Sequence, residues 1–308
     1  MHTTDDNLIE ESSIIPIVSG GLDHRRTTVT YQYALSSDIG QSREVNEDSA
    51  FATVMSRVSH FNTQSLGLFI AADGMGGHEA GEQASFAAIQ VAGESLLREV
   101  LLPLTNPRSE IWNSIPVSEA MTHAFEEAHR KVMEEVPAGA TTLTITLLMD
   151  RRIYVGHAGD CRLYILDDHS LRPITRDHSV LNRLIELEQL DQEEVELLAT
   201  DPRRNVLYRA IGQAEEVEFD FFSQLLEPEE ALLLCSDGLW GTVPDDIMRD
   251  IVREAESPAI ACQNLVNEAN QRGGPDNITV ILIYPVTVDL ELAEMGNAQD
   301  NDPVQTAR

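Results

Sequence analysis

Acidic side chains stand at the ends of several apolar, strand-like runs, and this placement favours metal-assisted chemistry. Two of these runs end in Asp-Gly, at Asp73-Gly74 and at Asp237-Gly238. Rigid strands can hold carboxylates within the small tolerances of a metal site. Carboxylates that are brought together repel one another unless cations neutralise them. The acidic residues at predicted strand ends are Glu47, Asp48, Asp73, Asp160, Asp237 and Asp276.

Oxygen ligands indicate a hard cation, Mg²⁺ or Mn²⁺, since zinc sites usually contain His or Cys. The sequence has neither HExxH nor CxxC spacing. Two such ions about 3.5–4 Å apart can bridge a water, lower its pKa and stabilise a phosphoryl group under in-line attack. The sequence lacks a Cys nucleophile with an Arg six residues later and a GxxxxGK[ST] loop, and residues 29–287 contain no DxDx[TV] motif. We therefore expect metal-assisted hydrolysis with water as the nucleophile.

Consecutive strand signals predict the scaffold that must position these carboxylates. Short β-branched or aromatic runs with brief turns between them favour antiparallel hairpins over βαβ units. Apolar residues at helical spacing predict two pairs of helices, with Ser118 and Ser257 as N-caps. The predicted strands are 29–35, 50–55, 66–72, 141–149, 152–157, 162–166, 217–222, 231–235 and 278–286, and the predicted helices are 82–101, 118–136, 245–255 and 258–271. The pattern predicts an α+β fold of antiparallel sheets covered by helix pairs.

Composition divides the 308-residue chain into one large domain and two polar ends. We expect a flexible N-terminal arm over 1–28, a single domain over 29–287 and an acidic, disordered tail over 288–308. Residues 176–212 interrupt the strand pattern with short helical pieces and many acids, which predicts a surface flap.

Net charge and apolar content limit where the protein can act. The formal charge of −31 opposes non-specific binding to nucleic acid or to anionic lipid. Apolar runs of about five residues are too short for a membrane span, and the start of the chain has no export pattern. The three cysteines, Cys161, Cys235 and Cys262, have no metal-binding spacing. We expect a cytoplasmic protein with reduced, buried thiols.

The motifs together resemble the PPM (PP2C-type) family of metal-dependent Ser/Thr protein phosphatases in its bacterial form. The resemblance covers about residues 31–285 and follows the family order. It rests on Ser37-Asp38-Ile39-Gly40 to Arg43, Asn46-Glu47-Asp48-Ser49, Asp73-Gly74-Met75-Gly76-Gly77-His78, Ala140-Thr141-Thr142, Gly156-His157-Ala158-Gly159-Asp160-Cys161-Arg162, Asp177-His178-Ser179, Arg204-Asn205-Val206-Leu207, Ser236-Asp237-Gly238-Leu239-Trp240 and Gly274-Pro275-Asp276-Asn277-Ile278-Thr279. The resemblance implies a four-layer αββα sandwich of two antiparallel sheets flanked by helix pairs.

The resemblance also implies a role for each residue of the site. Two core ions, Mn²⁺ or Mg²⁺, would share Asp73, and Asp160 with Asp237 would supply a weaker third site. One core ion would take the Gly74 carbonyl with water-held Glu47 and Asp48, and the other would take Asp237 and Asp276. Arg43 would hold the substrate phosphate, because a planar guanidinium matches two phosphate oxygens. Met75 stands where eukaryotic relatives have a His proposed as general acid, so bound water or another group would protonate the leaving alcohol.

These observations predict a metal-dependent phosphatase that removes phosphate from Ser or Thr of proteins, including a cognate Ser/Thr kinase. One alternative is a phosphoesterase on the same fold specialised for a phosphorylated anti-sigma antagonist. Another is a catalytically silent module that binds phosphoproteins. The acidic set at Asp73, Asp160, Asp237 and Asp276 argues against the silent module, because a binding module would not need all four.

Overall fold

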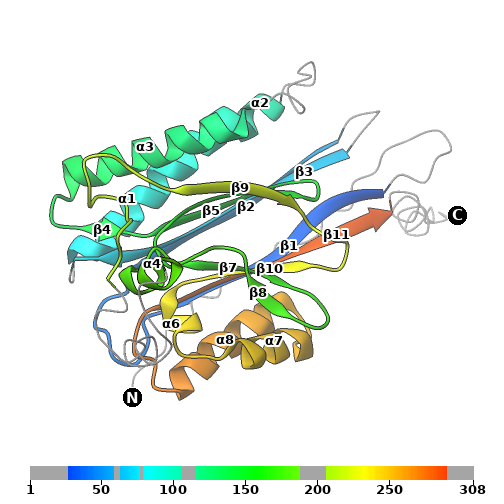
Figure 1. Ribbon diagram of the computed structural model, residues 1–308. Helices are drawn as coiled ribbons and strands as arrows, with labels where there is room; N and C mark the ends of the chain where they lie inside the picture. The colour runs from blue at the N-terminus through cyan, green and yellow to red at the C-terminus, as the bar shows by residue number, and fades with distance from the viewer. Residues whose placement is uncertain (1–26, 59–62, 77–78, 106–115, 188–205, 290–308) are drawn as a thin grey trace, which may run out of the picture.

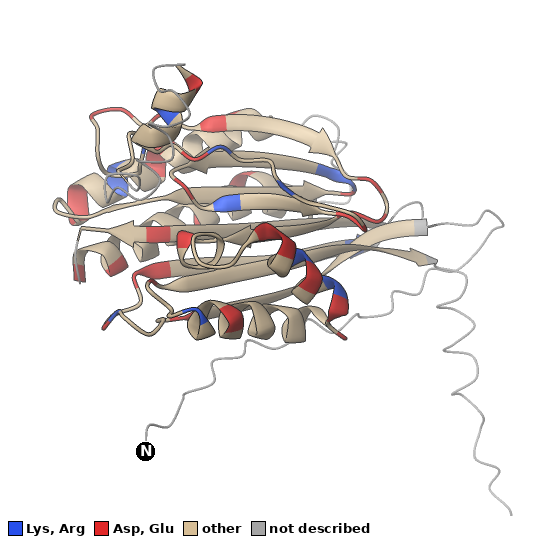
Figure 2. Ribbon diagram, turned by 60° about the horizontal axis from the view of Figure 1, so that its bottom comes forward, with Lys and Arg blue, Asp and Glu red and all other residues tan. Residues whose placement is uncertain are grey.

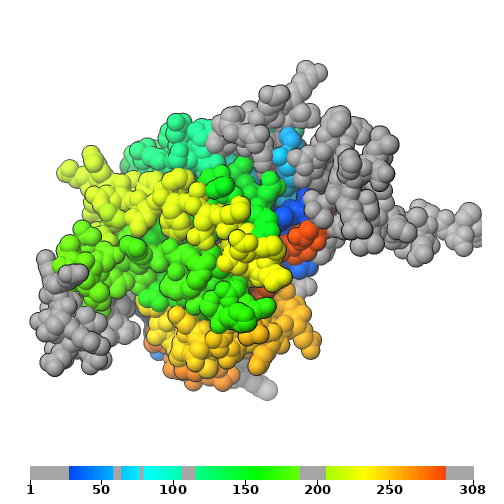
Figure 3. Space-filling model, turned by 45° about the vertical axis from the view of Figure 1, so that its right-hand side comes forward, coloured from blue at the N-terminus to red at the C-terminus, as the bar shows by residue number. Residues whose placement is uncertain are grey.

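Two antiparallel sheets lie face to face, and helices cover the outer side of each (Figure 1). The computed structural model describes residues 27–58, 63–76, 79–105, 116–187 and 206–289. The space-filling view shows the same stack from another side, with α1 and α3 at one end and α7 and α8 at the other (Figure 3). The predicted α+β sandwich of two sheets between helix layers is confirmed.

The first sheet has the strand order β1-β11-β10-β7-β8. Its central strand β10 buries alternate residues on opposite faces, with Leu233 toward the helices and Leu232 toward the second sheet. Helices α7 and α8 cover its outer face, and α6 is a single turn after β10. The elements of this half are β1 (Thr27–Asp38), β7 (Arg162–Leu166), β8 (Leu171–Pro173), β10 (Ala231–Cys235), α6 (Asp237–Trp240), α7 (Asp245–Glu254), α8 (Pro258–Gln271) and β11 (Ile278–Asp289).

The second sheet has the order β2-β3-β5-β6-β9, and the short β4 pairs with β3. Strand β3 is buried on both faces, because Leu68 faces the α1–α3 layer and Phe69 faces the first sheet. Gly156 lets α3 approach β6, since a Cβ there would lie 2.6 Å from Phe125. The elements of this half are β2 (Asp48–Val58), β3 (Thr63–Met75), α1 (Glu79–Leu96), the π-turn η1 (Leu97–Leu101), α2 (Leu102–Leu104), α3 (Val117–Glu135), β4 (Ala140–Thr141), β5 (Leu143–Met149), β6 (Arg152–Ala158), α4 (Val180–Glu186) and β9 (Asp220–Leu225).

Strand β9 and the start of α3 differ from the sequence prediction. The apolar residues Val217 and Phe219 pack against the helix layer before the strand begins, and Phe219 stacks on Phe125 with ring centroids 4.1 Å apart. Their hydrophobicity therefore reflects helix packing and not sheet pairing. Ser118 is wrong as an N-cap, because α3 already begins at Val117 after Pro116. A proline loses nothing at a helix start, where its missing N–H has no intrahelical partner.

Two further differences have local causes. The predicted helix 82–101 widens into a π-turn over Leu97–Leu101, which ends two residues before Pro103. A proline ring collides with the carbonyl four residues earlier in regular α geometry, and a wider turn relieves this collision. Strand β8 was not predicted, since it is a three-residue edge strand that contains Pro173. In contrast, Ser257 caps α8 as predicted, and its side chain accepts a hydrogen bond from the Ile260 N–H.

The first and last strands extend slightly beyond the predicted domain bounds of 29 and 287, because β1 starts at Thr27 and β11 ends at Asp289. The arm before residue 27, the tail after residue 289, the flap residues 188–205 and His78 lie outside the described residues. None of the described helices is both long enough and apolar enough to cross a membrane. All three cysteines are buried and free of disulfides.

Candidate active site

The register of β2 and β3 brings the first two carboxylates together. Asp48 opens β2 and lies directly opposite Asp73 in the antiparallel ladder. The Gly74 N–H then donates to the Glu47 carbonyl at 3.0 Å, which continues the pairing past Asp48. A Cβ on Gly74 would lie 2.2 Å from the Gly81 carbonyl oxygen, so this close approach of chain segments requires glycine. Residues 47, 48, 73 and 74 thus form one end of the second sheet.

The other sheet contributes residues from the end of β10 and the start of β11. The Ser236 hydroxyl donates to Oδ2 of Asp48 at 2.6 Å and accepts from the Thr279 N–H at 2.9 Å. Ser236 therefore connects the two sheets at the place where Asp237 follows β10. A Cβ on Gly238 would lie 2.0 Å from the Asn277 carbonyl oxygen, so the α6 turn lies directly against the segment that carries Asp276.

Asn277 holds the loop that carries Arg43 and Glu47. Its side-chain amide donates to the carbonyls of Ile39 and Val45 at 2.9 and 3.0 Å, and its Oδ1 accepts from the Glu47 N–H at 2.8 Å. This buried amide uses three of its hydrogen-bonding positions on one loop, which fixes the loop against β11.

Asp160 enters the same region from the end of β6. The Trp240 indole donates to the Asp160 carbonyl at 3.0 Å and thereby links this turn to α6. The Arg162 guanidinium stacks over the Trp240 ring at 3.5 Å and forms a two-pronged ion pair with Asp177, at 2.9 and 2.7 Å. Trp240 is partly buried against the core, and its hydrogen bond also supports the turn that carries Asp160.

The pKa shifts of the acidic side chains reflect both their burial and their neighbours' charges. Burial, together with the charges of Asp237 and Asp276, raises the pKa of Asp48 to about 7 against the lowering effect of the Ser236 hydrogen bond. Burial raises the pKa of Asp73 well above its ordinary value, followed by the charges of Asp48, Asp237 and Asp160. The pKa of Asp160 is raised mainly by burial and then by Asp237. Each carboxylate thus destabilises its neighbours' ionised forms, as expected of a cation site without its cations.

The residues fit hard divalent cations by their chemistry. The donors are carboxylate oxygens, and Oδ1 of Asp48 is buried without a hydrogen-bond partner among the described residues. No three His, Cys, Asp or Glu side chains in the described part of the chain are already close enough together to hold an ion.

Arg43 lies at the exposed rim of the acidic group, and its side chain is 44% exposed. Its guanidinium donates to Oδ2 of Asp276 at 2.7 Å and lies 3.6 Å from Oε2 of Glu47. The Arg43 guanidinium is thus held beside the carboxylates and can be reached from solvent. This position suits a group that binds an incoming anion next to the acidic site.

The residues predicted to form the site are therefore together, whereas the histidines on helix α3 are elsewhere. His123 is exposed and contacts Glu99, and His129 bonds to the Ala214 carbonyl at 3.0 Å. Sequence reasoning did not assign roles to Ser236 and Asn277, although both stand next to a strand-end aspartate. A polar residue adjacent to each Asp was the available signal. Asp and Glu also occur over the face that Figure 2 presents, so acidity alone does not locate the site.

Comparison with known proteins identifies the family. The profile described as Protein phosphatase 2C matches residues 41–257. The "Serine/threonine phosphatase stp" of Listeria welshimeri is 32% identical over 242 residues, which cover 76% of this chain and 94% of that protein. The serine/threonine phosphatase of S. agalactiae has a TM-score of 0.69 at 30% identity, covering 82% of this chain and 99% of that chain. The catalytic domain of PstP in complex with two manganese ions has a TM-score of 0.64 at 30% identity, covering 84% of this chain and 100% of that chain. The chain belongs to the PPM family of bacterial Ser/Thr protein phosphatases.

Proposed function

We propose that this protein is a Mn²⁺- or Mg²⁺-dependent phosphatase that hydrolyses phosphoserine and phosphothreonine in cytoplasmic proteins, among them a cognate Ser/Thr kinase. The observation that carries the proposal is the meeting of Asp48, Asp73, Asp160 and Asp237 from separate strand ends, where burial and the charge of Asp237 raise the pKa values of the other three. Such a concentration of like charge is stable only with bound cations or bound protons. The solved relative with two manganese ions supports the first explanation.

The proposed ligand roles follow the two sides of the site. Asp73 would contact both core ions, with the Gly74 carbonyl and water-held Glu47 and Asp48 on one side. Asp237 and Asp276 would complete the other side, and Asp160 with Asp237 would hold a weaker third ion. Divalent ions supply a water nucleophile of lowered pKa and neutralise charge on the phosphoryl group.

The chain's own groups orient the substrate and the carboxylates. Arg43 would bind two phosphate oxygens with its planar fork and release Asp276 toward the cation site. Ser236 keeps the Asp48 carboxylate turned into the site through its 2.6 Å hydrogen bond. The buried Asn277 amide keeps the Arg43 loop at a fixed distance from β11. Together these contacts place the phosphate-binding group beside the acidic group.

The test is hydrolysis of p-nitrophenyl phosphate and of a phosphothreonine peptide with Mn²⁺ and with EDTA. Wild-type protein should hydrolyse both substrates only with Mn²⁺, and Asp237→Asn should lose at least about 100-fold in kcat. Arg43→Lys keeps the charge but loses the fork, so it should raise KM more than it lowers kcat. Asp168→Asn is the matched control, because Asp168 is exposed in the turn between β7 and β8, away from the site.

Two outcomes would contradict the proposal in different ways. Hydrolysis that persists in EDTA would exclude the metal-dependent mechanism. A folded protein that binds Mn²⁺ but hydrolyses neither substrate would favour a regulatory module that binds phosphoproteins.

A further inference from the structure

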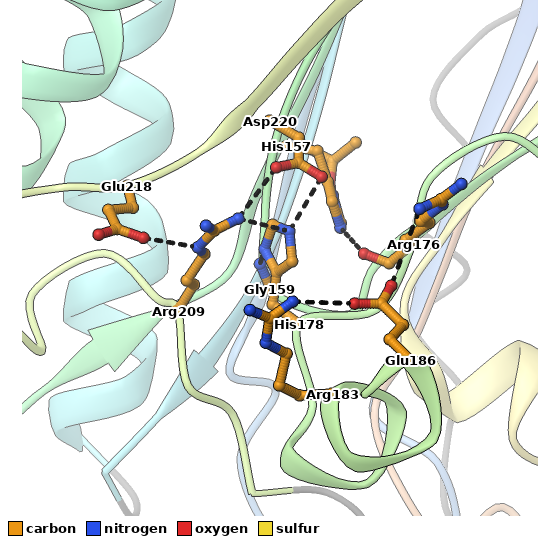
Figure 4. Close-up of polar contacts among 10 residues, drawn as sticks. His157, Gly159, Arg176, His178, Arg183, Glu186, Arg209, Glu218 and Asp220 are labelled. Atoms are coloured by element: carbon orange, nitrogen blue, oxygen red, sulfur yellow. Dashed lines mark hydrogen bonds and ion pairs between the residues drawn. The ribbon is translucent and has the colours of Figure 1, made fainter. Parts of the chain in front are cut away.

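The turn that carries Asp160 is held at both of its backbone groups by one buried histidine. The Gly159 N–H donates to Nδ1 of His178 at 3.2 Å, and the His178 N–H donates to the Gly159 carbonyl at 2.7 Å. His178 is 1% exposed, so water does not compete for these bonds. Figure 4 shows the imidazole standing directly against Gly159. The turn that carries Asp160 is therefore fixed by a residue that comes later in the sequence, after strands β7 and β8.

The proton on the imidazole is placed by its other neighbours. Because Nδ1 accepts from a backbone N–H, Nε2 carries the proton in the neutral ring. Nε2 lies 3.2 Å from Oδ2 of Asp220, which can accept that proton's hydrogen bond. Oδ1 of Asp220 accepts from Arg209 at 2.9 Å, and Arg209 in turn contacts Glu218 at 2.9 Å (Figure 4). Nη1 of Arg209 also lies 3.4 Å from Nε2, but the shorter contact with Asp220 favours the tautomer that can hold Gly159.

His178 also joins the two described ends of the predicted flap. Its carbonyl accepts from the Tyr208 N–H at 2.9 Å. The adjacent Ser179 pairs with Leu207 in an isolated bridge. The chain that leaves the core at residue 178 therefore returns beside the same residue, which itself contacts the turn before Asp160.

The Gly159 turn has little freedom to adopt another position. Gly159 has φ +116°, and a Cβ there would lie 2.5 Å from Thr142. The Thr142 Oγ1 accepts from the Asp73 N–H at 2.8 Å, and the Thr142 N–H donates to the Asp73 carbonyl at 2.9 Å. A shift of Gly159 therefore moves the support of Asp73 as well as Asp160.

We propose that His178 is a positioning residue, which holds the Gly159–Asp160 turn so that the Asp160 carboxylate faces Asp73 and Asp237. The proposal rests on the proposed function, in which these three carboxylates bind the ions. Asp220 acts through His178 by keeping Nδ1 available as an acceptor. His178 would thus hold a metal ligand in place without contacting the metal itself. Loss of a residue in such a position typically reduces metal affinity or activity by about 10–100-fold.

Two amide variants separate the contacts of the ring. His178→Asn puts an amide oxygen close to the place of Nδ1 and so keeps an acceptor for Gly159, whereas His178→Gln reaches toward Asp220 and loses that acceptor. We expect His178→Gln to lose about tenfold in kcat, with an unchanged KM for p-nitrophenyl phosphate because Arg43 is untouched. Mn²⁺ titration calorimetry without substrate should show about tenfold weaker binding at the weakest site. His178→Asn should stay within about threefold of wild type in both measurements.

Val252→Ala is the control for a general loss of stability, since it removes buried methyl groups from α7 on the far side of the first sheet. It should lower Tm without changing kcat or Mn²⁺ binding. A His178→Gln protein with a lowered Tm but with wild-type kcat and Mn²⁺ binding, as expected for Val252→Ala, would overturn the proposal. If His178→Gln does not fold, Asp220→Ala replaces it, and wild-type kcat and Mn²⁺ affinity in that variant would overturn the proposal. Wild-type protein without Mn²⁺-dependent hydrolysis would instead overturn the proposed function.

Discussion

Acidification should destabilise this protein through His157, a fully buried histidine in β6. The Arg176 carbonyl lies 3.1 Å from Nε2, which must therefore carry the proton, and Nδ1 accepts from the Thr144 hydroxyl at 2.9 Å. The neutral ring thus has both of its hydrogen bonds. Burial and, to a smaller extent, the neighbouring His178 ring lower the pKa of His157 to about 4. A protonated ring would need Nδ1 to donate, inside a closed space between two sheets.

The sign of the effect follows from proton binding in the two states. Between pH 6.5 and about 4 the unfolded chain binds a proton on this histidine and the native ring does not. The stabilisation is therefore complete above pH 6.5 and is lost as pH falls toward 4. At about 1.4 kcal/mol for each unit of pKa difference, the loss is about 3 kcal/mol over this window. His157→Gln has no such titration, so its stability should not show this loss.

Urea unfolding in EDTA at several pH values from 7 to 4.5 measures the difference. Asp48 acts in the opposite direction, because its raised pKa makes the native state bind more protons than the unfolded chain below pH 7. Only the difference between wild type and His157→Gln isolates the histidine. We expect wild type to lose between about 2 and 3 kcal/mol relative to the variant as pH falls. A difference in unfolding free energy that is constant with pH would refute the reasoning.

Two further substitutions test the contacts that assemble the site. Ser236→Ala removes the hydroxyl that donates to Asp48 at 2.6 Å. Because a hydrogen bond to a charged group is lost, kcat with Mn²⁺ should fall about tenfold or more. An unchanged kcat and an unchanged Mn²⁺ affinity would show that this bond does not orient Asp48. Gly238→Ala places a Cβ 2.0 Å from the Asn277 carbonyl oxygen and should cost more than about 2 kcal/mol in urea unfolding. Gly93→Ala is its control, since that helical Cβ would meet only Ile70 at 3.8 Å, and equal stability of the two variants would contradict the steric argument.

The sequence by itself determined most elements and supplied the prediction for the chemistry of the site. Strand β10 and residues 66–72 of β3 are continuous apolar runs, and the Asp-Gly that follows each run is visible without any structure. Helix α8 is specified locally by Ser257 and Pro258, which begin it where predicted. Each of these signals depends on neighbours within a few residues, so local pattern was sufficient. The family motifs then supplied the expected roles of the acidic residues.

Errors occurred where residues far apart in sequence decide the local structure. Phe219 has a side chain typical of a strand, but its burial comes from stacking on Phe125 of α3. Tertiary packing overrides a strand preference of this size, because such preferences amount to about 1 kcal/mol or less. Ser118 is a local error instead: it has the right type for an N-cap, but the helix already begins at Val117 behind Pro116.

Only the tertiary structure decided which groups meet. The β2–β3 register sets Asp48 opposite Asp73, and a shift of one residue would turn these side chains to other faces. Ser236 reaches Asp48 across the two sheets, and His178 reaches Gly159 from the start of the flap. Neither pairing has a spacing rule, since each depends on how separate elements pack. The sequence thus determined which carboxylates are available, and the packing of the two sheets decided how they face one another.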